Sequence, residues 1–216
     1  DMQNLADCSD FASLDAKLSP LVEEYGRWIE TQTKTPDLSA RRQGVADDLL
    51  NSARVARKRI QDGLALLKTD NVRRAFCVAN AAMAAQAKQR GARQEPPSTA
   101  SPQWRPFQLA FVLMNLKGIV DPQSADRERV DLLFFPTGGG KTEAYLGLAA
   151  FTLVLRRLEN PGILSAGVSV LMRYTLRLLT AQQFQRATAL VCAAELARLE
   201  DDANWGAEPF RIGLWV

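Results

Sequence analysis

The residues best suited to chemistry lie in one glycine-rich stretch after the middle of the chain. Pro136 and Thr137 are followed by three glycines, Lys141 and Thr142. Glycines let a backbone approach a phosphate closely with its N–H groups pointing inward. A lysine ammonium suits the β- and γ-phosphates, and a threonine hydroxyl suits Mg²⁺. We therefore predict a phosphate-binding loop for ATP and Mg²⁺, with these ligands: Thr137, Gly138, Gly139, Gly140, Lys141 and Thr142.

The flanking residues support this interpretation of the glycines. The apolar run 130–135 predicts a buried strand, and residues 141–158 predict a helix whose positive N-terminus faces the loop. Lys141 and Thr142 are the expected catalytic residues, and Glu143 could approach the metal or a nearby cation. The pattern G-x-x-x-x-G-K-[ST] is only partly matched, because Phe135 replaces its first glycine. An ordinary flexible loop is the alternative.

Composition narrows the class of protein. The 216 residues carry a net charge of +3 and include no histidine, which excludes histidine acid–base chemistry and histidine metal ligation. Three widely spaced cysteines without a C-x-x-C pair predict reduced thiols in the cytoplasm. The chain lacks both a long apolar run and a basic-then-apolar N-terminus, so we predict neither a membrane span nor secretion.

The first ninety residues predict an all-helical module. Apolar residues spaced three and four apart indicate helices over 11–33, 39–67 and from Asp70 onward. Ser19 and Pro20 are expected to interrupt the first of these helices, with Ser19 as an N-cap. Residues 91–103 are rich in Pro and Ser, and we predict a linker or exposed loop there.

Residues 104–216 predict a different architecture. Helical stretches at 104–117, 141–158 and 175–198 are separated by apolar runs at 130–135, 166–172 and 210–216. Such alternation predicts an α/β fold, a parallel sheet with helices on both faces. Nucleotide would then bind at the carboxyl ends of the strands, where the glycine loop lies.

A basic face lies on the second predicted helix. Residues 41–95 contain 12 basic and 5 acidic side chains, so an anionic partner is most plausible in this segment. Arg54, Arg57, Lys58 and Arg59 are candidates for contacts with DNA phosphates. A solvated face, or one that docks an acidic protein, is the alternative.

Two further motifs resemble those of superfamily 2 helicases and translocases. In W-R-P-F-Q, from Trp104 to Gln108, the resemblance implies that Gln108 reads adenine while Arg105 or a flanking aromatic holds the ring. The R-x-L-x-x-Q portion of helicase motif Ia recurs after Leu176, which replaces its threonine. The resemblance implies contacts to the DNA backbone by Arg177, Thr180 and Gln182, with Arg173 a looser candidate.

Taken together, R-P-F-Q, F-P-T-G-G-G-K-T-E-A-Y-L-G-L and L-M-R-Y-T-L-R-L-L-T-A-Q-Q-F-Q resemble the DrmA-like helicase family of the DISARM anti-phage system. The helical leader with A-F-C-V-A-N-A-A-M is also similar to that family. The resemblance implies a P-loop RecA-like lobe after the helical module. It further implies an ATP-driven motor in the bacterial cytoplasm that binds DNA and acts with a protein partner subunit.

Hydrolysis by such motors needs an acidic pair after a later strand and an arginine from a second lobe. Neither is visible, because Glu200, Asp201 and Asp202 follow a predicted helix. We therefore expect the chain to end inside the first lobe, before the acidic motif. The intact protein would hydrolyse ATP, and these 216 residues alone would be inactive. A non-helicase P-loop ATPase or nucleotide kinase, or a nucleotide-binding scaffold that recruits a protein, are the alternatives.

Overall fold

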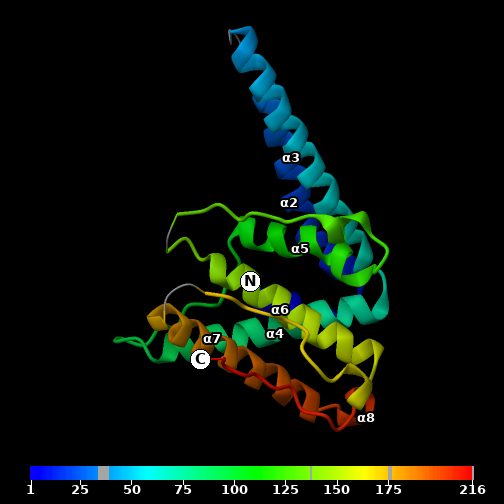
Figure 1. The fold of residues 1–216 in the computed structure, drawn as a ribbon, viewed down its shortest axis with the longest axis vertical. Coiled ribbons are helices and arrows are strands. Elements are labelled where there is room, and N and C mark those ends of the chain that lie inside the picture. The colour runs from blue at the N-terminus through cyan, green and yellow to red at the C-terminus, as the bar shows by residue number, and fades with distance from the viewer. Residues whose placement is uncertain (34–38, 137, 175–176, 216) are drawn as a thin grey trace.

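The computed structural model describes residues 1–33, 39–136, 138–174 and 177–215, without the side chains of residue 40 and residues 177–180. Short 3₁₀ helices η1 and η2 connect longer α-helices (Figure 1). The elements are α1 (Met2–Ala6), α2 (Phe11–Gln32), α3 (Ala40–Leu66), α4 (Asp70–Ala92), α5 (Pro106–Val120), η1 (Ala125–Glu128), α6 (Lys141–Glu159), η2 (Gly162–Ser165), α7 (Arg177–Leu199) and α8 (Asp202–Trp205).

The predicted α/β fold with a RecA-like parallel sheet is wrong. Throughout the described ranges the regular structure is helical, and the three predicted strands are irregular. A strand needs a neighbour that completes its hydrogen-bond ladder. In the first of these segments Val130, Leu132 and Phe134 are 97%, 85% and 88% exposed. The apolar runs indicated strands, but an apolar run does not show whether a partner strand lies beside it.

Helix α2 is continuous, so the predicted break at Ser19 and Pro20 is also wrong. The N-cap is Asp10, whose carboxylate accepts a hydrogen bond from Ser13 N–H at 2.7 Å. The helix passes through the exposed Pro20 because its other face is buried on both sides of the proline. That burial offsets the roughly 3 kcal/mol that an interior proline costs. The buried residues are Leu14, Leu18, Val22, Gly26 and Ile29.

Helices α2 and α3 pair side by side and form an arm that projects from the body (Figure 1). Towards its tip the arm exposes Trp28, Val45 and Leu49. At its base, by contrast, Ile60 and Leu64 of α3 are buried, and this part of the helix packs against α5.

Helix α4 is the centre of the body and packs against α1, α6 and α7. Its Phe76 and Met83 join one continuous core with Leu113 of α5, Phe151 of α6 and Leu190 of α7. The helices on either side of residues 91–103 therefore share a core, and a division into two domains at that segment stays a prediction. None of the helices in the described residues is long and apolar enough to cross a membrane.

Candidate functional site

The glycine loop has a backbone that glycine favours. Gly138 and Gly140 have φ values of +81° and +85°, in the left-handed region where side chains are strained. The Gly139 N–H donates to the Pro136 carbonyl at 3.0 Å and closes the turn. Gly140 is the N-cap of α6, so the loop leads directly into the helix.

The N-terminus of α6 faces this loop. Gly140 has no side chain that could cap the helix, and the first-turn N–H groups give this end a partial positive charge. Lys141 is the first helical residue, and its ammonium donates to the backbone carbonyl of Phe135. The half-buried Thr142 follows in the same turn. Such an end suits an anion.

Helix α5 fastens the loop in place. The Gln108 side chain donates from Nε2 to the Gly140 carbonyl at 2.7 Å and accepts from Arg105 N–H at 2.7 Å. Arg105 Nη1 donates to the Gly139 carbonyl at 2.8 Å, and the Phe107 ring stacks on Phe135 with centroids 3.9 Å apart. Because Gln108 is only 3% exposed and both ends of its amide are in use, it positions the loop. Adenine recognition by Gln108 and Arg105 stays a prediction.

Glu143 joins three helices at the same end of α6. Its Oε1 accepts from Arg90 Nη1 of α4 at 2.8 Å and from Arg186 Nη2 of α7 at 2.6 Å. Burial alone would raise the pKa of Glu143, but the hydrogen bond from Arg90 and the charge of Arg186 outweigh it and lower this pKa. The carboxylate is therefore ionised at neutral pH and holds α4, α6 and α7 together.

The charges around the α6 N-terminus are unbalanced. Four cationic side chains lie in this group of contacts, and Glu143 is the carboxylate that two of them share. An excess of positive charge beside a helix N-terminus favours a ligand with several negative charges. The four are Arg90, Arg105, Lys141 and Arg186.

The remaining predicted residues are only partly described. Thr137 lies outside the described residues, and so do the side chains of Arg177 and Thr180. Arg173 and Gln182 are exposed, which leaves both side chains accessible to a DNA backbone. Their contact with DNA stays a prediction.

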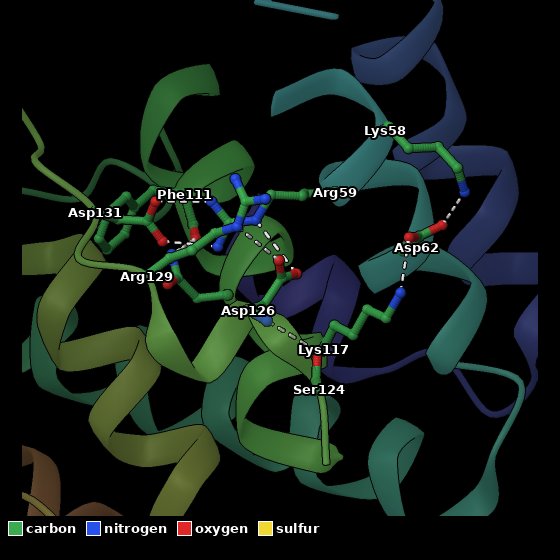
Figure 2. Close-up of polar contacts among 10 residues, drawn as sticks. Lys58, Arg59, Asp62, Phe111, Lys117, Ser124, Asp126, Arg129 and Asp131 are labelled. Atoms are coloured by element: carbon green, nitrogen blue, oxygen red, sulfur yellow. Dashed lines mark hydrogen bonds and ion pairs between the residues drawn. The ribbon is translucent and has the colours of Figure 1, made fainter. Parts of the chain in front are cut away.

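Figure 2 shows two residues of the basic face of α3, Lys58 and Arg59, paired with carboxylates of the protein. The exposed Arg54 donates to Asn51 of the same helix at 2.8 Å. Arg59 makes two hydrogen bonds to Asp131, both 2.7 Å long, and an ion pair with Asp126 at 3.3 Å. The neighbouring Lys58 pairs with Asp62. Arg57 donates to a backbone carbonyl of α2, at Val22. Arg59 is therefore both buried and ion-paired, and a DNA phosphate could bind it only after these ion pairs break.

Asp131 connects this cluster to the glycine loop. It lies in the irregular segment 129–136 that leads into the loop, and it contacts α3 through Arg59. The hydrogen bond from Arg59 lowers the pKa of Asp131, against the opposing effect of burial. The base of the arm thus holds the segment that leads into the candidate site.

Comparison with known proteins shows a likeness along the whole chain. No family model matches it. The chain is 38% identical, over 234 aligned positions that cover all of it, to the DISARM protein DrmA of Bacillus paralicheniformis. The chain is DrmA-like. It spans about a fifth of the length of that relative, so the resemblance concerns one part of DrmA.

In this DrmA-like chain, two residues of the site belong to no motif in the sequence. Arg90 and Arg186 lie 53 and 43 residues from Glu143 and belong to helices predicted only from apolar spacing. Only the surplus of basic residues in 41–95 hinted at Arg90.

The described residues contain no group of three acidic, cysteine or histidine side chains that could hold a metal.

Proposed function

We propose that this chain provides the ATP-binding part of a DNA-dependent ATPase, a helicase or translocase, that acts in DISARM anti-phage defence. The supporting observation is the glycine loop that leads into an uncapped helix with four cations around it. The likeness to the DISARM protein DrmA supports the role in defence. The described residues contain no sheet, so the proposal rests on the loop and the charges around it and not on the fold.

The residues present fit a magnesium-bound triphosphate. The loop amides, the first-turn amides of α6 and the ammonium of Lys141 would hold the phosphates, and the hydroxyl of Thr142 would bind Mg²⁺. Bound Mg²⁺ neutralises charge on the β- and γ-phosphates. Gln108 and Arg105 keep the carbonyls of Gly140 and Gly139 turned towards α5. The Gly139 N–H is engaged by the Pro136 carbonyl, so the ligand would bind to the other loop amides.

DNA would bind elsewhere on the same chain. The candidate contacts are Arg173, Arg177, Thr180 and Gln182, where α7 begins. Such contacts to the backbone give affinity without sequence preference. A protein partner subunit and a bacterial cytoplasmic location complete the proposal, and both follow from the resemblance to the DISARM family.

The decisive experiment measures ATP hydrolysis by the intact protein with and without DNA. We expect DNA to stimulate hydrolysis, and Lys141→Ala to lower the rate at least about a hundredfold, because it removes a charge that stabilises the transition state. Lys17→Ala, which alters an exposed lysine of α2, is the matched control and should leave the rate unchanged.

The other outcomes favour the rival functions. Hydrolysis that does not respond to DNA would favour a non-helicase ATPase or a kinase. Nucleotide binding with no hydrolysis under any condition would favour a scaffold that recruits a protein.

A further inference from the structure

We propose that Arg186 is a ligand of the nucleotide's phosphates, and that Glu143 occupies the phosphate position when no nucleotide is bound. This inference rests on the proposed nucleotide site and assigns a new residue to it. It predicts that Arg186 exchanges the carboxylate of Glu143 for a phosphate oxygen when nucleotide binds.

The first argument is the position of the Glu143 carboxylate. Glu143 lies in the first turn of α6, and its own backbone amide helps to lower the pKa of its carboxylate. Its Oε2 lies 3.5 Å from the place that a Cβ would take on Gly140. The carboxylate therefore sits against the helix N-terminus and the loop, where an anionic ligand would contact the amides.

The second argument is that the guanidinium groups are incompletely satisfied. Arg186 and Arg90 donate to one and the same oxygen of Glu143, at 2.6 and 2.8 Å. The Nε of Arg186 is buried without a hydrogen-bond partner in the described part of the chain, and its side chain is 23% exposed. One carboxylate oxygen thus serves two cations, and one buried donor is left over.

A polyphosphate would satisfy these donors better than Glu143 does. Each phosphate group offers several acceptor oxygens, and the planar fork of an arginine binds phosphate through two parallel hydrogen bonds. A triphosphate also carries more negative charge than a carboxylate, which suits the surplus of cations around the loop. Exchange would use the Nε that is now unpaired, so Arg186 has more to gain than Arg90, whose side chain is 49% exposed.

The test compares Arg186→Gln, Glu143→Gln and the double variant by calorimetry in the presence of Mg²⁺. The probes are ATPγS, AMP and inorganic tripolyphosphate. We expect Arg186→Gln to weaken the binding of ATPγS and of tripolyphosphate about 10- to 100-fold, whether residue 143 is glutamate or glutamine. This is the usual effect of losing a charged hydrogen bond. AMP should change much less. Glu143→Gln alone should strengthen ATPγS binding, because it releases Arg186 from its present partner.

Two control variants test this interpretation. Lys88→Gln, an exposed lysine of α4, is the control for loss of one positive charge and should have little effect. Arg186→Lys keeps the charge but loses the fork, so we expect intermediate affinity. It also serves if Arg186→Gln fails to fold, which thermal melting by circular dichroism would reveal.

The inference is overturned if Arg186→Gln has no effect once Glu143 is glutamine, since Arg186 would then act only by holding Glu143. It is also overturned if Lys141→Ala weakens ATPγS but neither Arg186 variant does, and in that case the nucleotide site itself survives. If the wild-type protein binds neither ATPγS nor tripolyphosphate, the proposed function and this inference are both refuted.

Discussion

Replacing Arg59 with methionine should destabilise the protein by about 3 kcal/mol, because it leaves the partly buried carboxylate of Asp131 without its partner. The Arg59 side chain is 10% exposed and fills the space between Asp131 and Asp126 (Figure 2). Methionine approximates its aliphatic stem but carries no charge. The variant therefore isolates the electrostatic contribution of the guanidinium.

The expected cost of Arg59→Met follows from the hydration and the ion pairs that each carboxylate retains. Removing one partner of a buried ion pair costs about 3–5 kcal/mol. Asp131 is 19% exposed and gains some hydration, while Asp126 keeps an ion pair with Arg129 at 3.4 Å. Both features place the cost at the low end of that range. The adjacent Lys58 is 70% exposed, and its partner Asp62 keeps Lys117 at 3.2 Å.

Urea unfolding followed by circular dichroism measures the difference. Lys58→Met is the control on the same helix and should cost less than about 1 kcal/mol, as surface pairs do. Arg59→Met should lower the urea midpoint much further with an unchanged slope. Adding Asp131→Asn to Arg59→Met should recover part of the loss. If Arg59→Met costs no more than Lys58→Met, the ion pairs of Arg59 do not stabilise this fold.

Acid should reduce the difference between wild type and Arg59→Met. The hydrogen bond from Arg59 holds the pKa of Asp131 below its ordinary value. Its contribution is therefore fully present above about pH 4, the ordinary pKa of an aspartate, and is lost as the pH falls through the lowered pKa. A gap between the two proteins that widens with acid would contradict this assignment.

Two further predictions concern packing and cysteine reactivity. A Cβ at Gly44 of α3 would meet nothing within 4 Å, whereas one at Gly63 of the same helix would lie 1.9 Å from the Leu113 carbonyl of α5. Gly44→Ala should therefore raise the melting temperature and increase the free energy of unfolding by about 0.5–1 kcal/mol. Gly63→Ala should lower the melting temperature. Equal shifts in melting temperature for the two variants would refute the close α3–α5 contact. Burial raises the pKa of Cys77 to about 11, while Cys192 is exposed. At pH 8 iodoacetamide should label Cys192 first, as peptide mass spectrometry would show, and faster labelling of Cys77 would contradict its burial.

The helices could be predicted because their signal is local. Leu14, Leu18 and Val22 recur at helical spacing along α2, and the same residues are buried in the structure. Pro20 misled the prediction, since a proline normally ends a helix. Its effect was overridden by the buried face, which depends on contacts with other helices.

The sheet was predicted wrongly, because strands depend on partners that the local sequence does not reveal. Val168 and Leu171 lie in an apolar run suited to a strand, yet both are exposed in an irregular segment. A short apolar run has the same appearance whether or not another strand lies beside it. Helix α6, in contrast, makes its hydrogen bonds within its own sequence.

The loop could be predicted from residue types, but its surroundings could not. Three successive glycines before Lys141 indicate a close approach to phosphate, and two of the three adopt positive φ. The arginines that flank Glu143 come from distant helices, so only the fold brings them together. The resemblance assigned adenine to Gln108, and that role stays a prediction. The bond of this amide to the Gly140 carbonyl could not be foreseen, because it joins residues 32 positions apart.

Calorimetric titration of the protein with ATPγS and Mg²⁺ tests the central claim most directly. We expect saturable binding that Lys141→Ala weakens at least about tenfold, the loss of a charged hydrogen bond to phosphate, while Lys17→Ala leaves it unchanged. If a sample that melts cooperatively shows no heat of binding, or if Lys141→Ala binds as tightly as the wild type, the glycine loop is not a nucleotide site.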